Sequence, residues 1–117
     1  MPTLADLLFY LNIALFFAHE LDAIQRREWR FFPFLRPLSD SAAFQLFTAA
    51  HIPITLLILW LLPIREFQLA FNGFLIVHAV LHFLLRNHPL LDFNRAFSRL
   101  WIYTPVPLSL LHLLLLS

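Results

Sequence analysis

Five of the six histidines in this 117-residue chain lie inside long apolar segments. Imidazole and carboxylate groups are ligands for zinc and iron, and they are the side chains most often used to transfer protons. An ionisable group inside a membrane span costs several kcal/mol if it has no partner. Histidines in these positions therefore indicate either close pairing or a functional site.

Four of these histidines are expected at similar depth. His78 and His82 are four residues apart, so they project from one side of a helix, one turn above the other. At about 1.5 Å per residue, His19 and His82 lie roughly 8 and 6 Å from the ends of their helices. The same rise places His78 about 12 Å and His51 about 15 Å deep. All four imidazoles are expected in one half of the bilayer.

Asp22 is expected to complete this site, because His19 and Asp22 share a helix face while Glu20 points about 100° away. We predict a site for a divalent metal, zinc or iron, with His19, Asp22, His78 and His82 as ligands. His51 is expected beside an open coordination position, and Asp22 and His51 are the candidate catalytic residues. Glu20 is expected to pair with an arginine or to face the headgroups.

Other interpretations of the histidines stay open. His51 and His78, on adjacent antiparallel helices, could ligate a haem from both sides. His19 and Asp22 could form a structural pair, and His112 is expected to pair with Asp6 near the chain termini. The HxxxH spacing of His78 and His82 lacks the glutamate of the zinc-protease motif.

The composition places the chain in a lipid bilayer. Apolar residues make up 61% of the sequence, the mean hydropathy is +0.77, and there is one glycine. The absence of cysteine excludes disulfides and thiolate ligands. All eight basic residues are arginines beside apolar runs, a distribution typical of topology signals, so nucleic acid is not expected as a partner.

Four segments are apolar and long enough to span a membrane, at residues 3–24, 42–62, 66–86 and 95–116. They predict an all-α integral membrane four-helix bundle, antiparallel and joined by short loops, as a single transmembrane domain over residues 1–117. Pro105 and Pro107 are expected to kink the fourth span. The loops after the first and third spans are arginine-rich and expected to be cytoplasmic, so both termini are expected outside.

A short motif near the end of the first span carries a family resemblance. The residues His19-Glu20-Leu21-Asp22-Ala23, followed by Glu28-Trp29-Arg30, resemble a family of small bacterial four-span membrane proteins of unknown function. The resemblance implies a bacterial inner-membrane location and supplies no activity.

Three functions follow from these features, and whether the chain is an enzyme is left open. The first is a small membrane metalloprotein, a hydrolase or other Lewis-acid enzyme acting on a lipid-soluble substrate. The second is a non-catalytic subunit of a larger membrane complex, or a homo-oligomer, whose apolar helices pack against partners. The third is a b-type haem protein.

Overall fold

The computed structural model describes residues 1–117 as helices joined by short connections, without strands. The elements are α1 (Leu4–Arg26), the 3-10 helix η1 (Glu28–Phe31), α2 (Asp40–Leu61), α3 (Arg65–Leu84), α4 (Ala96–Tyr103) and α5 (Pro105–Leu116). The predicted all-α architecture is confirmed.

Local sequence signals explain where the helices begin and break. The Thr3 hydroxyl accepts a hydrogen bond from the Asp6 backbone N–H at 3.1 Å, and the Asp6 carboxylate accepts one from the Thr3 N–H at 2.8 Å, a capping box at the start of α1. Ser39 caps α2 by accepting a hydrogen bond from the Ala42 N–H. Pro105 has no N–H to donate, and the fourth span divides there into α4 and α5.

Four helical segments are long and apolar enough to cross a membrane: α1, α2, α3, and α4 with α5 taken together. Their bounds lie within two residues of the predicted spans. The longest dimension of the molecule is 45 Å, close to the roughly 40–45 Å of a bilayer with its headgroup regions. These features are those of a multi-pass membrane protein.

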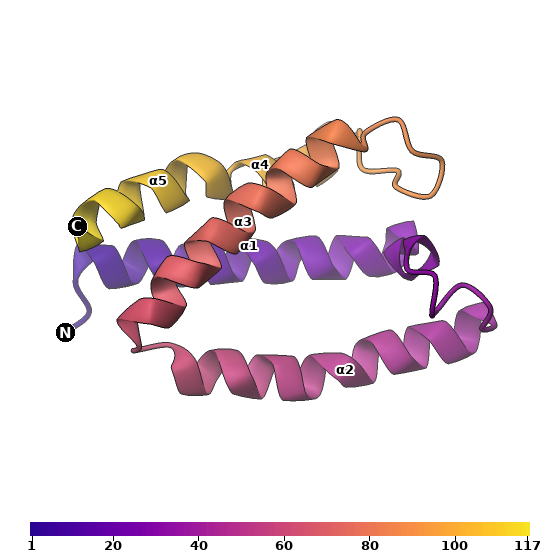
Figure 1. Cartoon of the computed structure of the whole chain (residues 1–117), viewed down its shortest axis with the longest axis horizontal. Coiled ribbons are helices and arrows are strands. Elements are labelled where there is room, and N and C mark those ends of the chain that lie inside the picture. The colour runs from indigo at the N-terminus through magenta and orange to yellow at the C-terminus, as the bar shows by residue number, and fades with distance from the viewer.

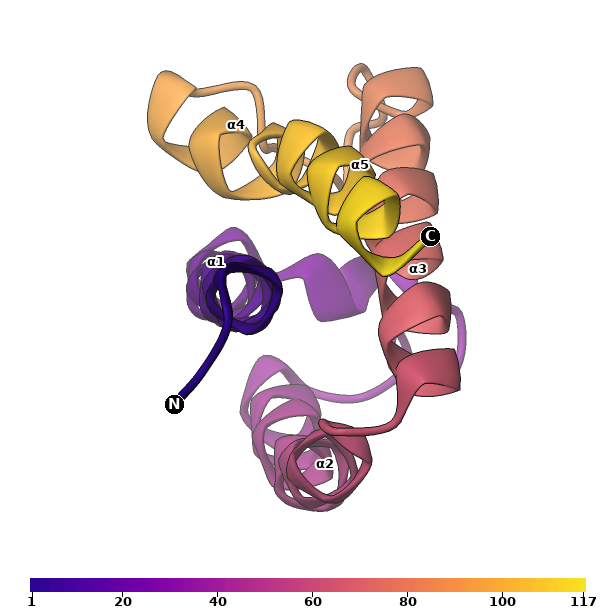
Figure 2. The same ribbon diagram turned by 90° about the vertical axis from the view of Figure 1, so that its left-hand side faces the viewer.

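The helices do not pack equally well. Helix α1 packs against α4 and α5, and α3 packs against α5. Helix α2 lies apart from this group and packs mainly against η1 (Figures 1 and 2). Only 11% of its membrane-length window is buried, compared with 33% for α1 and α3. One side of the bundle is therefore loosely closed.

A layer of neutral polar side chains joins α1, α3 and α5 near the chain termini. We call Asn12, Asn72, Ser109 and His112 the amide layer. The Asn12 amide donates to the Ser109 hydroxyl at 3.1 Å, and the Asn72 amide donates to His112 Nδ1 at 2.7 Å. All four side chains are essentially buried.

The expected pair between His112 and Asp6 is wrong. Asp6 is used at the helix terminus by Thr3, whereas the His112 ring stacks on Phe9 and accepts its hydrogen bond from Asn72. The reason is geometric: His112 turns into the bundle between α1 and α3, and the carboxylate stays at the exposed end of α1.

Candidate metal centre

Three histidines meet between α1 and α3. The ring centroid of His19 lies 4.6 Å from that of His78 and 5.1 Å from that of His82, and the His78 and His82 centroids are 4.6 Å apart. The i, i+4 spacing on α3 sets the last distance. The other two depend on α1 and α3 being held beside one another by α4 and α5, against which both helices pack. His19 and His82 are buried, and His78 is partly exposed.

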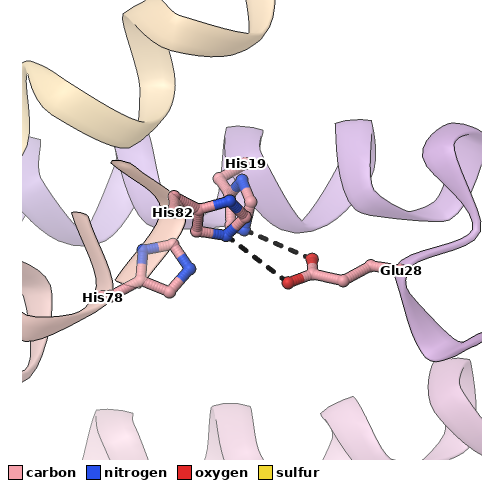
Figure 3. A group of neighbouring side chains, drawn as sticks. All are labelled: His19, Glu28, His78 and His82. Carbon is pink, nitrogen blue, oxygen red and sulfur yellow. Dashed lines mark ion pairs between the residues drawn. The ribbon is translucent and has the colours of Figure 1, made fainter. Parts of the chain in front are cut away.

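Glu28 is brought to the histidines by a sharp turn after α1. Arg27 has a φ of 55° and ends the helix in the left-handed conformation, so the chain reverses immediately after it. The next residue but one, Trp29, is buried with Leu35 and Ala43 and anchors η1 against α2. Glu28 is held between these two fixed points and directed back toward the end of α1 (Figure 3).

The two carboxylate oxygens of Glu28 face different rings. Oε2 lies 3.4 Å from His19 Nε2, and Oε1 lies 3.5 Å from His82 Nε2. Burial acts to raise the pKa of Glu28, but the interactions with His19 and His82 outweigh it and lower the pKa to about 2. Glu28 is therefore an anion at neutral pH, the form in which a carboxylate binds a metal.

The four side chains His19, Glu28, His78 and His82, which we call the histidine–glutamate cluster, have the spacing of a ligand set. Each offers one ligand atom, and these atoms all lie within 4.8 Å of one another. Ligands about 2.0–2.2 Å from a tetrahedral zinc ion are roughly 3.3–3.6 Å apart. The distances from Glu28 to His19 and to His82 lie in this range, each measured to a different carboxylate oxygen. The cluster could hold a metal ion.

The hydrogen bonding of His19 favours the same interpretation. Its side chain is 1% exposed, and neither ring nitrogen has a hydrogen-bond partner. Buried polar groups are nearly always hydrogen-bonded, so such an atom calls for an explanation. A metal ion bound through Nε2 would supply the missing interaction at that atom.

Asp22 lies outside the cluster. Its carboxylate is 3.6 Å from Arg26 Nε, one helical turn along α1, and both side chains are largely buried. The expectation that Asp22 completes the site rested on helix geometry alone and did not include the turn at Arg27, which brings Glu28 to the histidines. The signal available in the sequence was an acid next to a tryptophan just after the helix, in the segment Glu28-Trp29-Arg30.

Glu20 pairs with His51 rather than with an arginine. Glu20 Oε2 lies 2.7 Å from His51 Nε2, while its other oxygen lies 3.9 Å from His19 Nε2. His51 Nδ1 lies 2.7 Å from the backbone oxygen of Phe47. Glu20 therefore connects the histidine–glutamate cluster to α2. His51 contacts Glu20 and is not itself part of the cluster.

These contacts do not favour haem. A haem ligand needs a ring nitrogen free to bind iron. Both nitrogens of His51 are already within hydrogen-bond distance of acceptor oxygens, those of Phe47 and Glu20. The predicted His51–His78 ligation would require both contacts to be rearranged, whereas the histidine–glutamate cluster needs no such change.

A cavity of about 280 Å³ adjoins the cluster. Its polar walls are Glu20, Glu28, His78 and His82, and the rest is mostly apolar, including Phe16, Phe31, Phe32, Phe47 and Phe74. Two further cavities of about 420 Å³ each lie toward α2, and both have Glu20, Phe47 and His51 in their walls. The candidate metal centre is thus reached through apolar space.

Comparison with known proteins adds a family assignment and no activity. No curated protein and no solved structure matches the chain. A family model described as a family of unknown function, DUF6713, matches residues 5–117, a range that contains every element described above except Leu4, the first residue of α1. The chain belongs to this family of unknown function, DUF6713.

Proposed function

We propose that this chain is an intramembrane metal-binding protein that holds one divalent transition metal, zinc or iron, in the histidine–glutamate cluster. The observation that supports this most strongly is the convergence of four ligand atoms within 4.8 Å, from α1, η1 and α3, around a buried histidine without hydrogen-bond partners. The predicted ligands His19, His78 and His82 are kept, and Glu28 takes the place of Asp22.

Glu28 also supplies charge that the imidazoles cannot. Three neutral imidazoles would leave both positive charges of the ion uncompensated in a low-dielectric environment, which is costly. The Glu28 carboxylate cancels one of them. Zinc with these four ligands would have a closed tetrahedral shell, whereas iron would keep positions for further ligands.

The finer form of the proposal is a Lewis-acid enzyme acting on a lipid-soluble substrate, in which a metal that keeps a position free, such as iron, would polarise a substrate oxygen. The apolar cavity beside the cluster supports it, because a substrate there would lie next to the ligand set. Within it, Glu20 and His51 are the candidates for proton transfer in place of Asp22, which is paired with Arg26.

The proposed location is the bacterial inner membrane, with both termini on the periplasmic side. The two termini lie at the same end of the molecule (Figure 1), and the arginine-rich connections after α1 and α3 lie toward the other end. The positive-inside rule assigns that second end to the cytoplasm. The cluster then lies nearer the cytoplasmic surface.

Metal analysis of the purified protein tests the proposal. We expect about one equivalent of zinc or iron in the wild type, and far less in His82→Ala, because that variant loses a ligand. His88→Ala is the matched control, since His88 lies in the connection after α3, where its ring packs against Phe31 and accepts a hydrogen bond from the Leu90 N–H. Thermal unfolding in detergent verifies that each variant is folded.

Two results would contradict this proposal. One is wild-type protein that stays metal-free after incubation with each of the two ions and removal of excess. The other is metal content that is equal in the wild type and in His82→Ala. Loss of metal in His88→Ala as well would indicate non-specific binding to histidine.

A second candidate function is a subunit of a larger membrane complex or a homo-oligomer. The feature that favours it is α2, whose membrane-length window is 11% buried, so most of its apolar surface is available to other helices. Cross-linking from the exposed face, for example through Leu57→Cys, would give one defined product for a fixed partner. A protein that remains monomeric and uncross-linked in native membranes would argue against it.

A further inference from the structure

We propose that the protein binds an anionic phospholipid at the start of α4, where Arg95 and Arg99 hold the phosphate of the lipid headgroup. We call these two residues the arginine pair. Helix α4 lies at the edge of the molecule, on the side away from α2 (Figure 2). The site is separate from the histidine–glutamate cluster and needs no metal, so it goes beyond the proposed function.

The arginine pair has no partner within the protein, whereas every other arginine has one. Arg27 and Arg30 lie 3.3 and 2.6 Å from Asp40 Oδ2. Four more face a carboxylate or donate to a backbone carbonyl: Arg26, Arg36, Arg65 and Arg86. Arg95 and Arg99 are exposed, and the only hydrogen bond between them joins their backbones, from the Arg99 N–H to the Arg95 oxygen at 3.0 Å. Both guanidinium groups are therefore free to bind an external anion.

The connection that leads into α4 has an excess of positive charge. Between Arg86 and Arg99 the only acid is Asp92, and three arginines with this one acid leave a formal charge of +2. Asp92 is exposed and is not within ion-pair distance of either member of the arginine pair. The Asn94 amide donates to the Arg86 backbone oxygen at 2.6 Å, which holds the start of α4 beside the end of α3. The excess charge is thus concentrated in one place at the membrane surface.

The arginine pair lies where the fourth span enters the bilayer. That span covers Ala96–Leu116, so Arg95 lies just before it and Arg99 lies about 6 Å further along the helix. Helical side chains lean toward the N-terminus of their helix, so the Arg99 side chain leans back toward Arg95 and the surface. Both guanidinium groups are then expected at the level of the lipid phosphates. An unpaired charge at the edge of the hydrocarbon is costly, and a phosphate would remove that cost.

An apolar surface continues from the arginine pair toward the membrane centre. The residues four, seven and eleven positions after Arg99 share its side of the span, and they are Tyr103, Val106 and Leu110. Thr104 has helical backbone angles, so this spacing holds across the division between α4 and α5. Tyr103 and Val106 are partly exposed, and Leu110 is 52% exposed. An acyl chain attached to a phosphate at the arginine pair can therefore lie along the same helix, whereas a soluble phosphate would not use this surface.

A phosphodiester matches the arginine pair in both geometry and charge. Guanidinium groups bind phosphate oxygens through two parallel N–H groups. In a zwitterionic lipid the headgroup ammonium already neutralises the phosphate, whereas phosphatidylglycerol keeps one net negative charge. A basic side chain at the membrane surface favours anionic lipid by about fivefold. Two of them should therefore favour phosphatidylglycerol over phosphatidylcholine by about 25-fold.

The test measures which lipid lies beside Tyr103, one turn after Arg99. Tyr103→Trp is the reporter, made together with Trp60→Phe and Trp101→Phe, and the same chain with Tyr103 retained gives the background from the buried Trp29. The full-length protein is reconstituted in phosphatidylcholine vesicles that contain increasing fractions of brominated phosphatidylglycerol or brominated phosphatidylcholine. Bromine quenches tryptophan only at close range, so the two quenching curves give the relative affinity of the site. We expect phosphatidylglycerol to bind about 25-fold more tightly.

Three variants locate the preference. Arg99→Gln removes one member of the arginine pair, so the preference should fall to about fivefold, and Arg95→Gln combined with Arg99→Gln should abolish it. Arg30→Gln is the matched control, because it removes the same charge from the same end of the molecule, but Arg30 is held by Asp40. Its preference should stay within about twofold of the parent, since salt screens distant charges. Thermal unfolding in the same vesicles verifies that each variant is folded.

Glycerol 3-phosphate carries a phosphate without acyl chains, and it distinguishes a lipid ligand from a soluble one. At millimolar concentration, with the ionic strength held constant by sodium chloride, it should not change the quenching. Displacement of phosphatidylglycerol by this compound would overturn the assignment of a lipid.

Three further results would overturn the proposal: equal quenching by the two lipids, an unchanged preference after loss of both arginines, and an equal loss in Arg30→Gln and Arg99→Gln. The last result would mean that anionic lipid is attracted to the whole positive end of the molecule rather than to the arginine pair. None of these results bears on the metal site, because the histidine–glutamate cluster and the arginine pair share no residue.

Discussion

The histidine–glutamate cluster and the amide layer are both groups of largely buried polar side chains that several helices bring together, but their hydrogen bonding differs. In the amide layer, Asn12 donates to Ser109 and Asn72 donates to His112, so each side chain is hydrogen-bonded to one on another helix, and only the oxygens Asn12 Oδ1 and Asn72 Oδ1 have no partner. In the cluster, both ring nitrogens of His19 lack a hydrogen-bond partner. Side-chain hydrogen bonds between helices are typical of a structural contact, whereas ring nitrogens that converge without hydrogen bonds are typical of a ligand set.

The largest effect is expected for His19→Leu. Replacing the imidazole with an apolar side chain of similar size removes one ligand. Mutating a residue that only supports a ligand lowers metal affinity by about 10- to 100-fold, so loss of the ligand itself should lower zinc affinity about 100-fold or more. The metal-free protein should be equally or more stable, because the two unpartnered nitrogens are removed. Competition with a zinc chelator and unfolding in mixed micelles measure the two effects.

Both proteins are compared without metal. If His19→Leu then unfolds far more readily than the wild type, the cluster is a structural contact, as the amide layer is. The Asn12→Leu variant is a useful companion. It replaces a buried polar side chain on the same helix without touching the ligands, so zinc affinity should stay within about threefold of wild type.

The next effect is expected in the amide layer. Asn72→Ala leaves His112 Nδ1 without its donor in a buried position, which should lower the free energy of unfolding by about 2 kcal/mol. Zinc affinity should not change. Reversible unfolding in mixed micelles gives the free energy, and chelator competition gives the affinity. If Asn72→Ala loses zinc affinity without losing stability, the amide layer and not the cluster would behave as the metal site.

A smaller effect distinguishes Glu28 from Asp22 as the carboxylate of the site. Glu28→Gln keeps the shape but removes the charge near His19 and His82, so zinc affinity should fall about tenfold, the size of one charge-assisted interaction. Asp22→Asn should leave zinc affinity unchanged, since Asp22 faces Arg26. Equal losses in the two variants would restore Asp22 to the ligand set.

The Asp22 and Glu28 difference also illustrates what the sequence could predict. Helical spacing correctly places His78 above His82 on α3, and hydropathy gives the four spans to within two residues. Both signals are local and repeat along a helix. The position of Glu28 depends instead on one left-handed residue, Arg27, and on the burial of Trp29, and neither follows from a helical pattern.

The partner of Glu20 was missed for a related reason. Its direction, about 100° from His19, is what helix geometry gives. Which element lies in that direction depends on the position of α2 relative to α1. Helix α2 is mostly exposed, so its sequence has no clear buried face from which that position could be predicted. The stripe of Thr48, His51 and Thr55 was a usable signal, because all three line the cavity that also contains Glu20.

The smallest effect is expected for Ser109→Ala, which removes the hydroxyl that accepts the Asn12 amide at 3.1 Å. Single hydrogen bonds between membrane helices contribute about 0.6 kcal/mol on average, because the separated helices also find polar partners. A loss of this size, with zinc affinity unchanged, would indicate that the amide layer is a set of ordinary interhelical contacts. A loss several times larger would instead mean that Asn12, whose Oδ1 has no partner, depends on Ser109 for its position against α5. Unfolding of Ser109→Ala, Asn12→Leu and the double variant decides between the two, since non-additive losses measure the coupling directly.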